Sequence, residues 1–126
     1  MSTAPKHITY HREAAELELG WADGTVHRLS AELLRVHSPS AEVRGHGIGQ
    51  EVLQTGKRYV AINGIEPTGR YAIKIIFDDG HDSGLYDWAY LRKLGDEQTN
   101  YWQRYLDRLS NAGASREPLF IQAKQL

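Results

Sequence analysis

The feature that most constrains the fold of this chain is an Asp-Gly dipeptide that occurs twice beside segments of alternating apolar and polar residues. The first, Asp23-Gly24, separates residues 17–21 from residues 25–29. Aspartate followed by glycine favours the positive φ angles of a tight turn, and alternation with a period of two is typical of a strand with one buried face. We therefore predict a β-hairpin over residues 17–29.

The second dipeptide, Asp79-Gly80, lies between residues 71–77 and residues 81–86. In a strand over residues 71–77, four apolar side chains would share one face: Tyr71, Ile73, Ile75 and Phe77. We predict a second hairpin here, in which the chain returns as a strand from His81 to Tyr86. A short strand is also expected over residues 59–62 together with Ile65.

Serine and aspartate residues mark the starts of the expected helices. Ser30 can cap a short helix over residues 31–36, which ends before Pro39. Asp87 can cap a helix over residues 88–94. We expect Gly95 to end that helix in the left-handed conformation and Asp96 to cap a last helix that reaches about residue 111.

The last helix carries an aromatic stripe of Tyr101, Tyr105 and Leu109, which we interpret as packing rather than as a cofactor site. The glycine-rich residues 45–56 predict a mobile loop, and the apolar residues 119–121 lie in a tail. His27 is expected on an exposed strand face. The fold class is α+β, with an antiparallel sheet built from the two hairpins, short helices packed on it and a C-terminal helix.

Composition narrows the function further. With 126 residues, 40% of them hydrophobic, one domain is expected, and a formal charge of -1 gives no cationic field for nucleic acid. Residues 1–12 contain no apolar run of a signal or membrane anchor, so we expect a soluble, cytoplasmic protein without a membrane partner. The absence of cysteine excludes disulfides and thiolate ligands, so any metal would need histidine and carboxylates.

Four motifs between about Ile8 and Gly95 carry a family resemblance. They are residues 17–24 (LELGWADG), residues 33–35 (LLR) followed by 37–43 (HSPSAEV), residues 77–86 (FDDGHDSGLY) and residues 88–92 (WAYLR). In this order they resemble the gamma-butyrobetaine hydroxylase-like N-terminal domain family. The resemblance implies such a domain over residues 9–95, after a flexible N-terminus (1–8) and before a C-terminal helix (96–112) and a tail (113–126).

The resemblance also implies where a structural zinc would be held in relatives. The family's Cys-x-Cys-x-x-Cys loop and its histidine match Ser38, Ser40, Val43 and His81. Hydroxyls are poor zinc ligands, valine offers no ligand atom, and one histidine cannot hold the ion alone. We therefore expect no metal and no cofactor, with the loop held by local hydrogen bonds and by Val43 turned inward.

Two other functions stay open. A metal (iron) binding protein or small metal-dependent enzyme would gather His37, His46 and His81 around an ion, with Asp79 or Asp82. His81 and Asp82 are adjacent, however, and adjacent strand residues point to opposite faces. The other alternative is a structural homo-oligomer.

The expected function is a small non-catalytic binding or accessory domain. In the family, this module precedes an iron and 2-oxoglutarate oxygenase domain or is fused to P-loop iron–sulfur carriers, so the resemblance implies a protein partner that assists iron–sulfur assembly or an oxygenase. Only about thirty residues follow Gly95, too few for an oxygenase domain, and no catalytic motif is present, so we expect no enzyme.

The candidate partner-binding residues are Arg35, His37, His81, Tyr86 and Trp88, because exposed arginine and aromatic side chains concentrate binding energy. Tyr86 and Trp88 are expected to lie at least partly in the core. Arg35 is expected to pair with Asp78 or Asp82.

Overall fold

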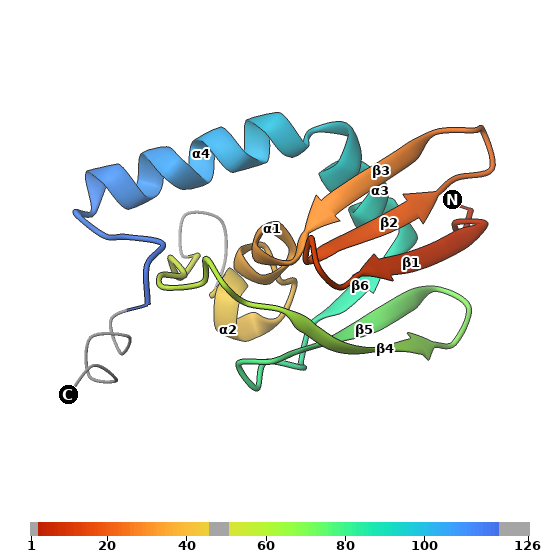
Figure 1. The fold of residues 1–126 in the computed structure, drawn as a ribbon, viewed down its shortest axis with the longest axis horizontal. Helices are drawn as coiled ribbons and strands as arrows, with labels where there is room; N and C mark the ends of the chain where they lie inside the picture. Colours follow the sequence, from red (N-terminus) through yellow and green to blue (C-terminus); the bar gives the residue numbers. More distant parts are fainter. Residues whose placement is uncertain (1–2, 46–50, 119–126) are drawn as a thin grey trace.

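Two separate antiparallel sheets of three strands form the frame of the protein (Figure 1). The computed structural model describes residues 3–45 and 51–118. The first sheet has the order β1-β2-β3, with β1 His7–His11, β2 Glu16–Gly20 and β3 Val26–Ser30. The second has the order β4-β5-β6, with β4 Ile62–Thr68, β5 Ala72–Phe77 and β6 Leu85–Asp87.

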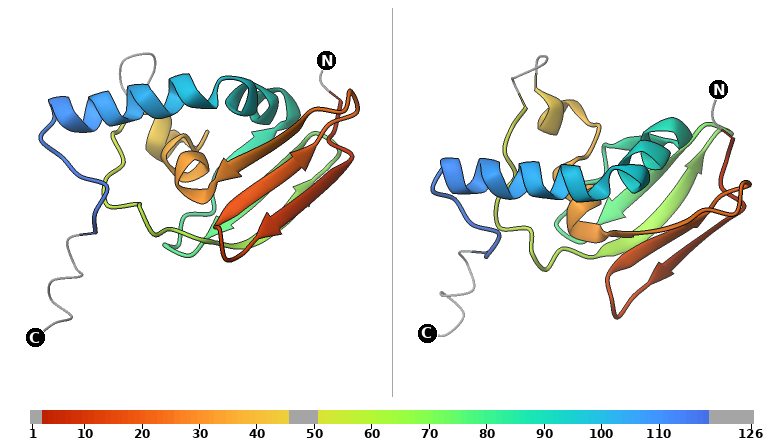
Figure 2. Two further views of the ribbon diagram at one scale, coloured as in Figure 1. Left: turned by 45° about the horizontal axis from the view of Figure 1, so that its top comes forward. Right: turned by 90° about the horizontal axis from the view of Figure 1, so that it is seen from above.

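Four helices complete the described fold: α1 Ala31–Val36, α2 Ala41–Arg44, α3 Trp88–Asp96 and α4 Gln98–Asn111. α1 and α2 lie beside α4 at the end of the molecule opposite the β2–β3 and β4–β5 turns (Figures 1 and 2). The predicted α+β class is confirmed. The two predicted hairpins belong to different sheets and do not share one.

The first hairpin is confirmed. Gly24 has a φ of 90°, and the Asp23 carboxylate accepts a hydrogen bond from the Thr25 amide at 3.0 Å. β1 is a strand that the sequence analysis does not predict. It includes His7 and Ile8, which were assigned to the flexible N-terminus. It pairs with β2 so that His7 lies opposite Gly20.

The turn of the second hairpin is confirmed, but its return strand is wrong. Gly80 has a φ of 89°, and the Phe77 amide donates to the His81 carbonyl at 3.0 Å. β6 begins only at Leu85, because the backbone amide of His81 donates to Asp79 and the imidazole turns inward toward serine side chains. Residues 81–84 therefore form an irregular loop.

The strand expected over residues 59–62 is also displaced, since β4 begins at Ile62. Tyr59 is exposed, and the Val60 amide bonds back to the Lys57 carbonyl in a turn. Contrary to the prediction, Tyr71 does not lie on the buried face of β5. It is 76% exposed, because it follows Gly69 in the turn before the strand.

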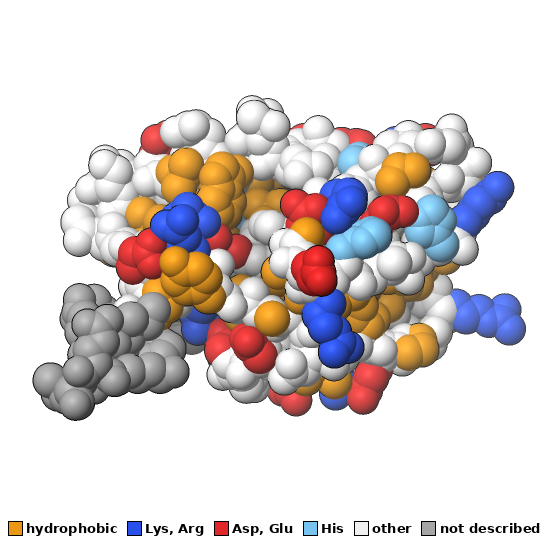
Figure 3. Space-filling view, in the orientation of Figure 1, with side chains coloured by type: hydrophobic (Ala, Val, Ile, Leu, Met, Phe, Trp, Pro, Cys, Tyr) orange, Lys and Arg blue, Asp and Glu red, His pale blue; other side chains and the backbone are white. Residues whose placement is uncertain are grey.

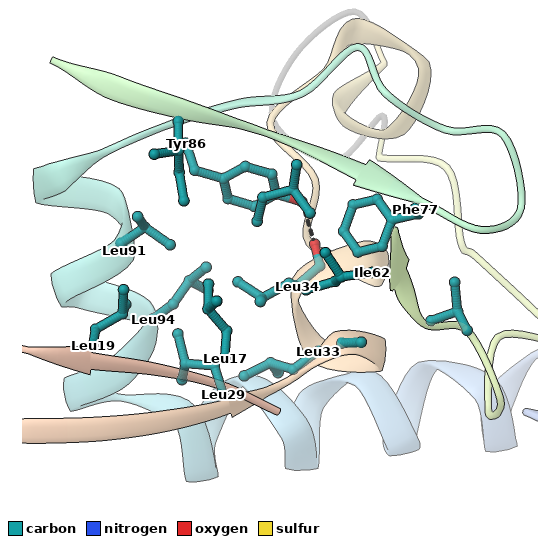
Figure 4. Packing of buried hydrophobic residues seen from close by; sticks show 14 of the residues in the cluster. Leu17, Leu19, Leu29, Leu33, Leu34, Ile62, Phe77, Tyr86, Leu91 and Leu94 are labelled. Atoms are coloured by element: carbon teal, nitrogen blue, oxygen red, sulfur yellow. Dashed lines mark hydrogen bonds between the residues drawn. The ribbon is translucent and has the colours of Figure 1, made fainter. Parts of the chain in front are cut away.

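The core lies between the two sheets and includes α1 and α3 (Figure 4). Leu17, Leu19 and Leu29 come from the first sheet, and Leu91 and Leu94 come from α3. From the second sheet, Ile73, Ile75 and Phe77 are buried as predicted. The fully buried Tyr86 donates its hydroxyl hydrogen to the Leu34 carbonyl at 2.5 Å, which satisfies a polar group that would otherwise be costly to bury.

The helix starts at Ser30 and Asp87 are confirmed, because Ser30 accepts from the Leu33 amide and Asp87 from the Tyr90 amide. The roles assigned to Gly95 and Asp96 are wrong. α3 continues through Gly95 to Asp96, and Glu97 joins it to α4 without a side-chain cap.

His27 explains the glycine at position 95. A Cβ atom at Gly95 would lie 2.2 Å from Nδ1 of His27. The imidazole is buried, contrary to its predicted exposure, and it accepts from Trp21 Nε1 at 2.9 Å while its Nε2 lies 3.0 Å from Asp96. Gly95 is therefore needed for close approach of the β3 side chain to α3, not as a helix stop.

α4 packs through the predicted stripe. Tyr105 and Leu109 are buried against Val36 of α1, and Tyr101 is half-buried, so the packing interpretation is confirmed. Residues 46–50 of the predicted loop and the apolar residues 119–121 lie outside the described residues. None of the helices in residues 3–45 and 51–118 has the length and apolar content that crossing a bilayer would need.

Candidate binding site

The loop after α1 meets the second hairpin in a buried cluster of two serines and a histidine. Nε2 of His81 lies 2.8 Å from Oγ of Ser38 and 3.3 Å from Oγ of Ser40. The Ser40 amide also donates to Ser38 Oγ at 3.3 Å. Three of the four positions that match the family's zinc ligands thus lie together.

The other side of the His81 ring meets a carboxylate. Nδ1 lies 3.4 Å from Oε2 of Glu42, whose other oxygen accepts from Ser83 Oγ at 3.3 Å. Burial lowers the pKa of His81, and the Arg35 cation lowers it further, while Glu42 acts in the opposite direction. The imidazole is therefore neutral at neutral pH.

These residues do not fit a zinc ion. Hydroxyl groups are poor zinc ligands, and Nε2 of His81 is already bonded to Ser38. Val43 has no ligand atom, and it is buried, as predicted from the sequence. The described residues also hold no group of three or more histidine or acidic side chains suited to a metal, and His46 of the iron hypothesis lies outside them.

The series of serine, histidine and carboxylate also resembles the triad of a hydrolase, but the serine is buried and the carboxylate is exposed, the opposite of a triad. In such a triad the nucleophile faces substrate and the carboxylate is buried. Here Ser38 is 1% exposed and the Glu42 side chain is 72% exposed. A Cβ atom at Gly84 would lie 2.4 Å from Ser38 Oγ, so backbone closes over the hydroxyl. The cluster fastens the loop and offers no reactive oxygen to solvent.

Arg35 forms a second connection between α1 and the Asp79-Gly80 turn. It is buried and donates to Asp79 at 2.8 Å, not to Asp78 or Asp82 as predicted, and Lys57 reaches the same oxygen at 2.6 Å. Partial burial alone would raise the pKa of Asp79, but the bonds from Lys57, the His81 amide and Arg35 lower it to about 2.

A cleft of about 730 Å³ lies beside this cluster, lined from α1, α2, α3, α4 and the segments next to them. Its described lining residues are Val36, His37, Ser38, Val43, Arg44, Gly45, Glu51, Tyr90, Tyr101, Arg104, Tyr105 and Arg108. A concave site of this size with aromatic walls and a few convergent polar groups is typical of a binding site.

Three guanidinium groups line the cleft. That of Arg44 lies 5.2 Å from the ring centre of Tyr90, and that of Arg104 lies 4.9 Å from the ring centre of Tyr101. Arg108 donates to the Glu51 carbonyl at 3.4 Å. Within residues 3–45 and 51–118, no ion pair joins any of these three arginines to a carboxylate.

His37 forms a neutral part of the wall. Its Nδ1 lies 3.0 Å from the Leu33 carbonyl, and its ring meets Tyr101 edge-on at 5.0 Å. Burial lowers the pKa of His37, and the nearby cations of Arg108 and Arg104 lower it further. The positive charge of the cleft therefore comes from arginine and not from imidazole.

Hydroxyl groups of two cleft tyrosines are already committed to backbone. Tyr90 donates to the His37 carbonyl at 2.5 Å and Tyr105 to the Gln54 carbonyl at 2.8 Å. Burial raises the pKa of Tyr105 to about 12. Both hydroxyls therefore hold the walls together, and the half-buried Tyr90 ring presents aromatic surface to the cleft.

Of the five candidate partner-binding residues, the structure brings only His37 to the cleft, where Ser38 and Val43 of the family's zinc positions also lie. Arg35, Tyr86 and His81 are buried in structural roles. Trp88 is half-buried and donates to the Arg70 carbonyl at 2.7 Å. Sequence reasoning missed Arg44, Tyr90 and the arginines of α4. The only available signal was Arg104 and Arg108 at a spacing of four, which places both on one helix face.

The fold and the site define a small α+β domain. In it, hydrogen bonds between His81 and two serines hold the loop after α1, at the positions that match the family's zinc ligands. The chain belongs to the gamma-butyrobetaine hydroxylase-like, N-terminal domain family, whose profile matches residues 8–92. No curated protein matches the chain.

Solved structures of similar proteins share this fold. Two proteins whose solution structures were determined by NMR are 47% and 49% identical, with TM-scores of 0.82 and 0.80. Each alignment covers 94% of this chain, and 93% and 88% of the respective structure. A crystal structure of a protein of unknown function from Acidithiobacillus ferrooxidans is 36% identical, with a TM-score of 0.62, over 72% of this chain and 91% of that one.

Proposed function

We propose that this protein is a non-catalytic binding domain that holds a partner protein in the cleft between α2 and α4. The observation that carries the proposal is the set of Arg44, Arg104 and Arg108, which line the cleft without an ion-pair partner among the described residues. Arginine and aromatic side chains are the types that contribute most binding energy at protein interfaces.

The hydroxyl groups of Ser38, Tyr90 and Tyr105 support binding rather than chemistry. Ser38 is enclosed, and Tyr90 and Tyr105 use their hydroxyls to bond backbone carbonyls. The Ser38–His81 contact has a different use: it holds one wall of the cleft in place. A rigid wall supports binding because less conformational entropy is lost when the partner docks.

Family context suggests the partner. The resemblance seen in the sequence implies modules that work with a P-loop iron–sulfur carrier or with an iron and 2-oxoglutarate oxygenase. In this proposal the domain assists one of these proteins by docking to it, and the cleft is the contact surface.

Isothermal titration of this protein with a purified P-loop iron–sulfur carrier, and separately with a purified oxygenase of that class, tests the proposal. We expect one of them to bind, and the double variant Arg104→Glu/Arg108→Glu to abolish binding through charge reversal. Arg12→Glu/Arg70→Glu makes the same charge change on exposed residues outside the cleft and serves as control. Failure of both proteins to bind, or equal loss in both variants, would overturn the proposal.

A further inference from the structure

We propose that the cleft recognises an acidic segment of the partner, in which several Asp or Glu side chains meet the three arginines. This inference rests on the proposed function and specifies its chemistry. Guanidinium groups match carboxylates with two parallel N–H donors, which gives both attraction and orientation.

The arrangement of the cations favours more than one carboxylate. Arg104 and Arg108 are four residues apart on α4, so they lie one helical turn apart on the same face. Arg44 reaches the cleft from α2. A ligand with a single anionic group can meet only part of this set, whereas an extended segment can place a carboxylate at each wall.

The aromatic rings keep two of these cations oriented. Arg44 lies over Tyr90 and Arg104 over Tyr101, which favours in-plane approach of an anion to the N–H edges. His37 adds no positive charge of its own, because its pKa is lowered by burial and by the neighbouring arginines, so the attraction for carboxylates comes from the guanidinium groups. Of the described lining residues, only Glu51 carries a carboxylate.

The size of the cleft suits a peptide segment, and the net charge of the chain argues against a nucleic acid. The volume of about 730 Å³ is at the upper part of the range for a small-molecule pocket, about 300–1,000 Å³, and accommodates several side chains. The whole chain has a formal charge of -1, and on the face shown in Figure 3 Lys and Arg side chains are interspersed with Asp and Glu. Binding to a nucleic acid backbone depends on a broad cationic surface, which such a balance does not provide.

Fluorescence polarisation with defined probes tests the inference. The probes are a fluorescein-labelled peptide of consecutive glutamates and the matched glutamine peptide. We expect the glutamate peptide alone to bind, with affinity that falls as salt is raised because the contacts are ionic. Arg104→Ala/Arg108→Ala should weaken it by at least about fivefold, and Arg12→Ala/Arg70→Ala, which removes the same charge elsewhere, by less than about twofold.

Three results would overturn the inference. The glutamine peptide could bind as tightly, both double variants could lose affinity equally, or free glutarate could displace the peptide at concentrations that point to a small dicarboxylate ligand. Each of these results leaves the titrations with whole partner proteins to be judged separately. Failure of the acidic-segment chemistry is therefore distinguishable from failure of the binding-domain proposal.

Discussion

Nε2 of His81 lies 2.8 Å from Oγ of Ser38, although the two residues are 43 positions apart in sequence. The contact joins the loop after α1 to the loop after the Asp79-Gly80 turn. It shows that the loop path on which relatives are expected to bind a metal can be held by a neutral hydrogen bond between buried side chains.

Restoring thiolates at this loop should create a zinc site. In the variant Ser38→Cys/Ser40→Cys/Val43→Cys, three thiolates and the His81 imidazole supply the four ligands that structural zinc prefers. We expect one zinc per chain by elemental analysis and a rise in melting temperature that chelator removes.

The matched control for this rebuilt site adds His81→Ala to the three cysteines. It should bind zinc more weakly, because one ligand is replaced. A folded triple-cysteine variant that takes up no zinc would show that the loop does not bring these four positions into ligand geometry.

Gly95→Ala should lower the free energy of unfolding by about 2–3 kcal/mol, because the new methyl group would collide with a His27 ring that is bonded on both nitrogens. In a His27→Ala background the sign should reverse. Alanine would then gain up to about 1 kcal/mol over glycine as a better helix former. Urea unfolding of the four proteins checks this, and equal effects of Gly95→Ala in both backgrounds would contradict it.

Asp79 should make the fold sensitive to acid. Its pKa of about 2 in the folded chain lies below its ordinary value of 3.8, so the carboxylate stabilises the fold above about pH 4, and this contribution is lost as pH falls toward 2. Asp79→Asn should therefore cost about 1–2 kcal/mol at pH 7 and little near pH 2.

Unfolding by urea across this pH range measures the difference between Asp79→Asn and wild type. Asp82→Asn is the control, because Asp82 is exposed and makes no ion pair within the described residues. A cost for Asp79→Asn that does not change with pH would argue against a role for the charged carboxylate.

Tyr86→Phe should cost about 1 kcal/mol, because it deletes the hydroxyl that donates to the buried Leu34 carbonyl and keeps the ring. Tyr71→Phe removes a hydroxyl from a side chain that is 76% exposed and should change stability by less than about 0.5 kcal/mol. Chemical unfolding compares the two, and equal costs would contradict the proposed role of the buried bond.

Local rules predicted the parts of the fold that local chemistry decides. Asp23-Gly24, Ser30 and Asp87 occupy the turn and cap positions expected from their side chains. The predictions for Gly95 and His27 were wrong for one reason. The burial of His27 and the need for glycine at position 95 both arise from the packing of β3 against α3. Short-range sequence patterns do not contain that contact.

The candidate site was less predictable than the fold. The resemblance correctly directed attention to Ser38, Ser40 and His81, which meet in the structure. The cleft arginines were missed because Arg44 comes from α2 and Arg104 from α4, 60 positions later in sequence numbering. Solvent-exposed arginines are common, so only their convergence distinguishes these, and convergence requires the folded chain.

The separation of the strands into two meanders also affects how quickly the chain can fold. Within each sheet, strands pair only with their sequence neighbours, so every pairing closes a short loop and can form early. We expect the docking of the two preformed meanders to be the slow event, since no backbone ladder among the described strands spans them. Side chains between them, such as Tyr10, whose hydroxyl accepts from the Ile62 amide, set the barrier and should slow folding when truncated.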